Sequence, residues 1–196
     1  RAPAAAEVDP AIGSPLAVPL LPRYDDEGEL YIGIANTRPP QTLALLLQMA
    51  EGSADPDAVP APVQWSCLDA DRWVSLHDGA LLEDGTRGLI NSGLVRFALP
   101  AVRPSTRMPA GAYWLRATIA RASAGVCDAV AVHPNAVVAV FADQGNAPDH
   151  LDAALAPGSV DSPVVPTPGL GKLKQPYSSF GGKAAEREAD FDLRVS

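Results

Sequence analysis

Apolar and non-apolar side chains alternate at every second position in several short stretches of this chain. The clearest stretches begin at Glu29, Val63, Val95 and Tyr113, and segments rich in proline, glycine and aspartate separate them. Successive side chains of a β-strand point to opposite faces, so this pattern predicts strands with one buried face. Short strands joined by turns predict an all-β fold, an antiparallel β-sandwich of the jelly-roll or immunoglobulin-like kind.

Further parts of the chain extend this interpretation. Residues 42–50 have the leucine, alanine and glutamine content of a helix, but they are short and flanked by breakers, so we predict a strand buried on both faces. Residues 63–76 read as a hairpin that turns at residues 69–71. The last apolar stretch, 126–141, is interrupted at residues 133–135 and is expected to complete the sheets.

The composition of both ends differs from that of the middle. Residues 1–27 are rich in proline and alanine, which favours a linker or the tail of a preceding domain. Residues 28–142 contain the alternating stretches and are predicted to form the β-sandwich domain. Residues 143–196 read as a Pro/Gly-rich connector and the start of a following domain, with charges at helical spacing over 184–195. The chain does not begin with Met, and we expect it to be a fragment of a longer protein.

The charge balance argues against two kinds of partner. The net charge is -8 and the pI about 4.7, so phosphates and anionic membrane surfaces are repelled. We therefore predict no nucleic acid partner. No stretch approaches the ~20 apolar residues of a membrane span, and no signal peptide pattern opens the chain. Assembly in the cytoplasm is the corresponding expectation.

The two cysteines, Cys67 and Cys127, lie in apolar, strand-like stretches. There a free cysteine behaves as a small core residue. A single bridge between them in an oxidising compartment remains an alternative.

Motifs for catalysis or metal binding are missing from the sequence. It contains no G-x-S-x-G elbow, and the glycines at 169–171 and 181–182 lack the spacing of a phosphate loop. The histidines have no zinc spacing, and the acidic runs 25–27 and 69–71 lack the EF-hand pattern, so hydrated turns explain them better than a Ca²⁺ site. We predict no enzyme, no metal and no cofactor.

Aromatic residues on the predicted strands give the candidate interaction surface. Trp65 shares a face with Val63 and Cys67, so we expect it in the core. Trp114 shares a face with Arg116 and Thr118, which fits either a contact surface or a second packed layer. The candidates for such a surface are Tyr113, Trp114, Arg116, Tyr177 and Phe180.

Five segments in order carry a resemblance to a known family: residues 28–34, 39–56, 63–66, 84–97 and 175–183. The second includes Gln48-Met49-Ala50-Glu51-Gly52, and the last includes Phe180-Gly181-Gly182-Lys183. Together they resemble the baseplate J-like wedge proteins of extracellular contractile injection systems, of the antifeeding-prophage and Photorhabdus virulence cassette type. The resemblance runs from about residue 21 to the end of the chain. The members are much longer, and the basic helical motif that follows this point in them has no counterpart here.

The resemblance implies a structural role without catalytic residues. The expected partners are other wedge, hub and sheath subunits, and the expected location is a phage-tail-like particle. Extended arms can add a strand to a neighbour's sheet, and we expect the connector 143–182 to lie along a neighbouring subunit. Two other classes stay open: a carbohydrate-binding β-sandwich, because of the aromatic strands, and an enzyme of unrecognised type.

Overall fold

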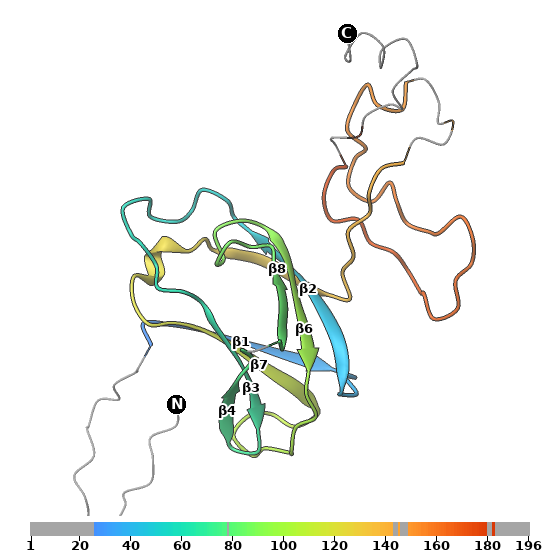
Figure 1. Cartoon of the computed structure of the whole chain (residues 1–196). Helices are drawn as coiled ribbons and strands as arrows, with labels where there is room; N and C mark the ends of the chain where they lie inside the picture. The colour runs from blue at the N-terminus through green and yellow to red at the C-terminus, as the bar shows by residue number, and fades with distance from the viewer. Residues whose placement is uncertain (1–25, 78, 143–144, 146–148, 180–181, 183–196) are drawn as a thin grey trace, which may run out of the picture. The chain divides into compact units, whose positions relative to one another are not determined.

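The computed structural model describes residues 26–77, 79–142, 145, 149–179 and 182, and these contain eight strands and no α-helix (Figure 1). The chain divides into two compact units, residues 1–137 and 138–196. All the strands belong to the first unit. They are β1 (Gly28–Ala35), β2 (Gln41–Met49), β3 (Gln64–Asp69), β4 (Arg72–Ser75), β5 (Leu81–Asp84), β6 (Gly93–Leu99), β7 (Ala112–Ile119) and β8 (Ala129–Pro134).

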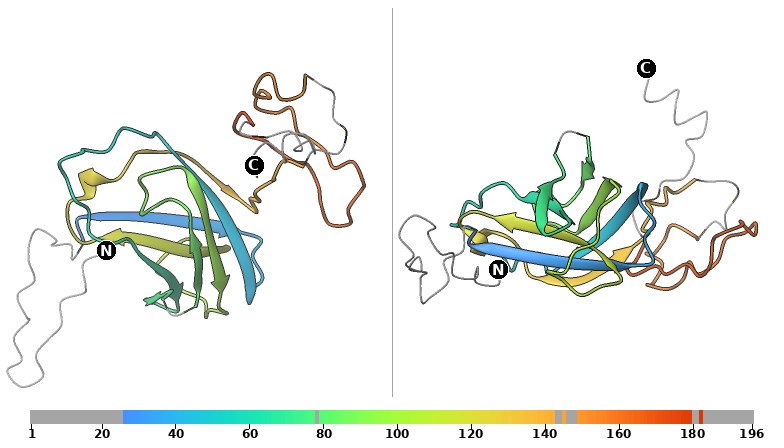
Figure 2. Two further views of the ribbon diagram at one scale, coloured as in Figure 1. Left: turned by 45° about the horizontal axis from the view of Figure 1, so that its top comes forward. Right: turned by 90° about the horizontal axis from the view of Figure 1, so that it is seen from below.

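The strands form two four-stranded sheets whose pairs are all antiparallel. The first has the order β1-β7-β3-β4 and the second β5-β6-β2-β8. All views show β1 alongside β7, and β2 alongside β6 (Figure 2). The all-β sandwich prediction is confirmed. β1 and β2 lie in different sheets, whereas the first two strands of an immunoglobulin domain share one.

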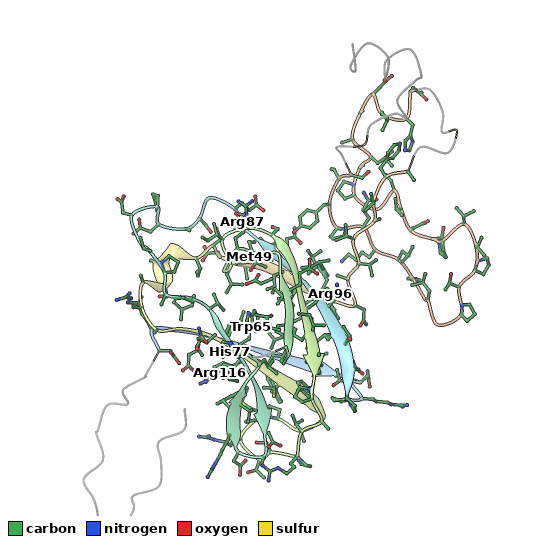
Figure 3. The ribbon with its side chains drawn as sticks, viewed as in Figure 1. Met49, Trp65, His77, Arg87, Arg96 and Arg116 are labelled. Carbon is green, nitrogen blue, oxygen red and sulfur yellow. The ribbon has the colours of Figure 1, made fainter. Side chains whose placement is uncertain are left out.

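The core fills the space between the two sheets. Trp65 of β3 packs its ring edge-on against Phe97 of β6, with ring centroids 5.0 Å apart. Trp65 is 1% exposed and lies in the interior, as expected (Figure 3). The inward-facing positions of β2, β6 and β7 supply the other large buried side chains, among them Leu43, Leu45, Leu47, Val95, Leu99 and Leu115.

The strand prediction for residues 42–50 is confirmed by β2. This strand pairs with β6 on one side and β8 on the other, and every second side chain from Leu43 to Met49 is buried. One face is buried rather than both. Pairing and burial outweigh the helical propensity of the leucines and alanine here, because propensity is a weak preference that tertiary contacts override.

The last apolar stretch forms less strand than expected. β8 ends at Pro134, and Asn135 has a positive φ of 59°, a left-handed conformation that interrupts the extended backbone. Residues 137–141 are in no strand, so the expectation that they complete a sheet is wrong. The physical reason is that a proline removes a ladder donor and a left-handed residue redirects the strand.

A tightly bonded loop connects β5 to β6. The Thr86 side chain is fully buried; its Oγ1 donates to Asp84 Oδ1 at 2.5 Å and accepts from the Leu89 amide at 3.0 Å. A Cβ on Gly93 would lie 2.3 Å from the carbonyl oxygen of Gly85, so the close approach of these two backbone segments requires glycine.

Both cysteines are buried and free, so the bridge that the sequence left open is not formed. Cys67 lies in the core, and Cys127 Sγ donates to the Ile90 carbonyl at 3.0 Å.

In the second unit the described residues form loops. Leu155 and Ser179 make an isolated antiparallel bridge, and Gly158 donates to the Gln175 carbonyl at 3.0 Å. The Phe141 and His150 rings stack with centroids 5.8 Å apart. The N-terminal arm up to residue 25 and the predicted helical stretch 184–195 lie outside the described residues.

Candidate interaction surface

The outer face of the β1-β7-β3-β4 sheet gathers aromatic and charged side chains instead of a simple polar layer. The register places Tyr31 of β1 opposite Arg116 of β7, and Arg116 opposite Ser66 of β3. On the β4 side, Trp73 is opposite Leu68. These positions alternate with the core residues, so the same period of two that fills the core also builds this face.

Arg116 lies at the centre of the face. Its guanidinium carbon is 5.0 Å from the centroid of the Trp73 ring, a cation–π distance. Its Nη1 is 3.8 Å from Glu29 Oε1, and its Nε donates to Ser66 Oγ at 3.4 Å. The side chains of Arg116 and Glu29 are 22% and 18% exposed, so the ion pair is largely withdrawn from water.

Tyr31 and Trp73 meet over the middle of the sheet. They come from its two outer strands, yet their ring centroids are 5.5 Å apart at an interplanar angle of 53°. The Tyr31 hydroxyl donates to the Glu29 carboxylate, and burial together with this carboxylate raises the pKa of Tyr31. The outer face therefore carries a packed cluster, which we call the Arg116 cluster: Glu29, Tyr31, Ser66, Trp73 and Arg116.

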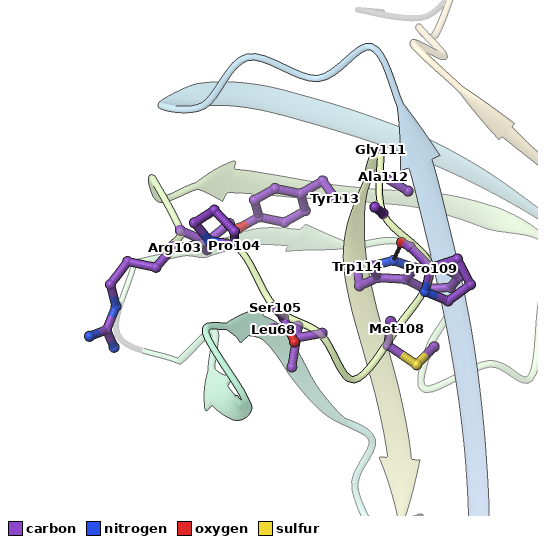
Figure 4. Close-up of a pocket in the computed structure, with 12 residues that line it drawn as sticks. Leu68, Arg103, Pro104, Ser105, Met108, Pro109, Gly111, Ala112, Tyr113 and Trp114 are labelled. Atoms are coloured by element: carbon purple, nitrogen blue, oxygen red, sulfur yellow. Dashed lines mark hydrogen bonds between the residues drawn. The ribbon is translucent and has the colours of Figure 1, made fainter.

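Trp114 extends this face toward the start of β7. Its ring lies over Gly33 of β1, where a Cβ would be 2.8 Å from the indole Cη2. Its Nε1 donates to the Pro109 carbonyl at 3.0 Å, a bond drawn in Figure 4. Trp114 also lines a pocket of about 210 Å³ between the first residues of β7 and the loop 102–111.

Two aspartates of the β3–β4 turn hold the loop 102–111 in place. Asp69 accepts from the Arg103 side chain at 2.7 and 3.2 Å and from the Arg103 amide at 2.7 Å, and these bonds lower the pKa of Asp69 to about 2. Asp71 accepts from Ser105 Oγ at 2.9 Å and from the Thr106 amide at 3.2 Å, which lowers its pKa too. Both carboxylates are thus engaged by the protein itself. Across the described residues, no group of three or more His, Cys, Asp or Glu is placed to hold a metal ion.

The structure places the predicted surface residues in different environments. Trp114 and Arg116 lie together on the outer face. Tyr113 is 5% exposed, and its hydroxyl donates to the Pro100 carbonyl at 3.2 Å, so its side chain belongs to the core and the prediction was wrong for it. The reason is alternation: Tyr113 points inward with Leu115. Tyr177 belongs to the second unit, where its buried hydroxyl has no hydrogen-bond partner among the described residues. Phe180 lies outside the described residues.

Sequence reasoning missed Tyr31, Glu29 and Trp73. The alternation in β1 already places Glu29 and Tyr31 on the face that points away from the core, so the sequence alone predicts that they share a face. The position of Trp73 beside them was not, because it depends on the strand order β1-β7-β3-β4.

The arrangement is chemically suited to contact with a protein. Arginine, tryptophan and tyrosine are the residues enriched in protein interfaces and in their energetic hot spots. A sugar platform needs free ring faces, whereas here Arg116 and Tyr31 lie against the Trp73 ring.

Comparison with known proteins assigns the chain to a family. The pattern of one family, described as baseplate protein PVC11-like, matches residues 22–196, most of the chain. The chain belongs to the PVC11-like baseplate protein family. No curated protein sequence matches it significantly.

This PVC11-like baseplate protein is a structural component of a phage-tail-like particle and assembles with other baseplate subunits. The family match covers the entire sandwich and the second unit. No helix in the described part of the PVC11-like chain is long and apolar enough to cross a membrane.

Proposed function

We propose that this PVC11-like protein is a wedge subunit of the baseplate of a contractile injection system, without enzymatic activity. In this role it surrounds the central hub together with other wedge subunits, and the sandwich binds a neighbour through the outer face of the β1-β7-β3-β4 sheet. The proposal combines the family membership with the ordered sequence segments that resemble wedge proteins.

The observation that carries the docking face is the Arg116 cluster with the adjacent Trp114. An outward face of a sandwich is ordinarily polar and solvated. Here the side chains are already fixed by one another, so binding would freeze few rotamers, which lowers the entropic cost of association.

Ser75 gives a test that replaces no residue of the Arg116 cluster. It is exposed, follows Trp73 on the same face of β4, and lies opposite Ser66. Ser75→Arg adds bulk and charge to the proposed interface. Thr42→Arg is the matched control, because Thr42 is an exposed strand residue on the outer side of the other sheet, opposite Ala98.

The measurement is the amount of this chain in purified particles, relative to sheath protein, when each variant replaces the wild type. We expect Ser75→Arg to reduce incorporation at least about tenfold, corresponding to 1.4 kcal/mol of lost binding. Thr42→Arg should leave it unchanged. Equal incorporation of both variants would refute this face as the docking surface, and absence of the wild-type chain from the particle would refute the wedge role.

A further inference from the structure

The segment that joins the two units has the sequence of a strand but forms no strand in the structure. Residues 136–141 read Ala-Val-Val-Ala-Val-Phe, with no charge, no proline and no glycine. β-branched and aromatic residues are those that sheets favour. Yet Val137, Val138 and Val140 are 81%, 72% and 86% exposed, and neighbouring exposed apolar side chains are typical of an interaction site.

The backbone of this segment is unpaired beyond its first residue. Ala136 still donates to the Ala44 carbonyl of β2, at 3.3 Å. From Val137 to Val140, neither amides nor carbonyls hydrogen-bond to any described residue. A strand that adds to a sheet edge needs backbone groups that are free to hydrogen-bond and side chains that fit the pockets beside that edge. This segment has a free backbone and apolar side chains.

We propose that residues 137–141 add as a strand to an unpaired sheet edge of a different baseplate subunit. This inference rests on the proposed function, because it names how one neighbour is held. The proposed contact is separate from the Arg116 cluster: it uses main-chain hydrogen bonds, and alternate side chains give the specificity.

A second copy of the chain is a poor partner for this segment. β4 and β5 are edge strands of four residues, and β8 carries a register shift. The remaining edge, β1, begins beside Asp26 and Glu27 and contains Glu29, and the whole chain has a charge of -8, so copies repel each other. We therefore expect a heterologous edge that carries apolar side chains and has basic residues near it.

Amide hydrogen exchange is the first test. In the free chain residues 137–140 should exchange as fast as an unstructured peptide, because their amides are unbonded. In the assembled particle we expect alternate amides of the segment to slow at least about a hundredfold, since an edge strand donates every second amide. A wild-type chain that is incorporated but exchanges equally fast in both states would overturn this inference and leave the wedge role standing.

Proline substitutions give a signature that general destabilisation cannot imitate. Ala139→Pro and Val140→Pro remove neighbouring amides, only one of which would face the partner. We expect one variant to lower incorporation at least about tenfold and the other to have a much smaller effect, since edge strands accept proline where its nitrogen faces away. Equal tolerance of both, or equal loss in both, would contradict strand addition.

Two control variants separate backbone from side chain. Val140→Thr keeps the amide and the β-branched shape, and should incorporate better than the proline variant that fails. Val59→Pro repeats the substitution at another exposed valine whose amide makes no hydrogen bond in the described structure, and should incorporate normally.

Light scattering on the isolated chain distinguishes a second copy of the chain from a different subunit as the partner. We expect a monomer. A dimer that the failing proline variant dissociates would overturn the assignment to a different subunit.

Discussion

The guanidinium carbon of Arg116 lies 5.0 Å from the ring centroid of Trp73, two strands away on the outer face of the first sheet. This contact links the edge strand β4 to β7. The same guanidinium pairs with Glu29 of β1 at 3.8 Å. One side chain thus contacts both outer strands of the sheet.

Replacing Arg116 by Met should destabilise the sandwich. Met keeps much of the apolar stem but loses the charge, which leaves the largely buried Glu29 without its cation. We expect a loss of about 1–2 kcal/mol in the free energy of unfolding, measured by urea denaturation followed by circular dichroism. A double-mutant cycle with Trp73→Leu should give a coupling energy of about 0.5–1 kcal/mol.

The matched control is Arg96→Met on the other sheet. Arg96 pairs with Glu83 at 3.3 Å, but both side chains are about half exposed. Exposed pairs contribute about 0–1 kcal/mol, so this variant should lose clearly less stability. Equal losses for Arg116→Met and Arg96→Met would show that the Arg116 cluster has no special role.

Gly33→Ala should be destabilising because of Trp114. The new Cβ would lie 2.8 Å from the indole ring, which must move and give up its bond to the Pro109 carbonyl. We expect a loss of about 1–3 kcal/mol, the range for overpacking. Gly171→Ala is the control, since a Cβ there meets nothing within 4 Å. If Trp114→Ala does not reduce the cost of Gly33→Ala, the steric explanation is wrong.

Thr86→Val should weaken the β5–β6 loop. Valine keeps the shape but removes the hydroxyl that accepts from the Leu89 amide at 3.0 Å, so a buried donor loses its partner. The expected loss is about 1–3 kcal/mol in the free energy of unfolding, read from urea titrations. Thr86→Ser retains the hydroxyl and should recover more than half of it. A serine variant as unstable as the valine variant would mean that the methyl group, not the hydrogen bond, matters.

The sandwich itself was predictable because each strand has a local sequence pattern. Leu30, Ile32 and Ile34 alternate with outward residues, and a buried face at period two needs no knowledge of the partner strand. The same reasoning placed Trp65 inside. The assignment of Tyr113 to a surface did not follow this reasoning, because the alternation of Tyr113 with Trp114 already placed them on opposite sides of the strand.

The parts of the structure that the sequence did not predict depend on contacts between distant segments. Trp73 meets Tyr31 only because β7 and β3 lie between their strands in this sheet. Residues 137–141 have the composition of a strand, yet they form none, because the left-handed Asn135 interrupts the extended backbone before them. Local propensity does not tell which sheet edge is available to them. Strand order and pairing are properties of the whole chain.

Acid should loosen the loop 102–111 before it affects the core. Arg103 lowers the pKa of Asp69 to about 2 from a usual 3.8, so the carboxylate favours the folded loop above pH 3.8 and this contribution disappears as the pH falls toward 2. Carbon-detected NMR of the Asp69 carboxyl should show a midpoint near pH 2, and the Arg103 amide should shift with it. Asp69→Asn should abolish that change in the Arg103 amide while the Trp65 indole signal, buried in the core, stays constant over the same range. A midpoint near 3.8 in the folded chain would mean that the Asp69–Arg103 pair does not form in solution.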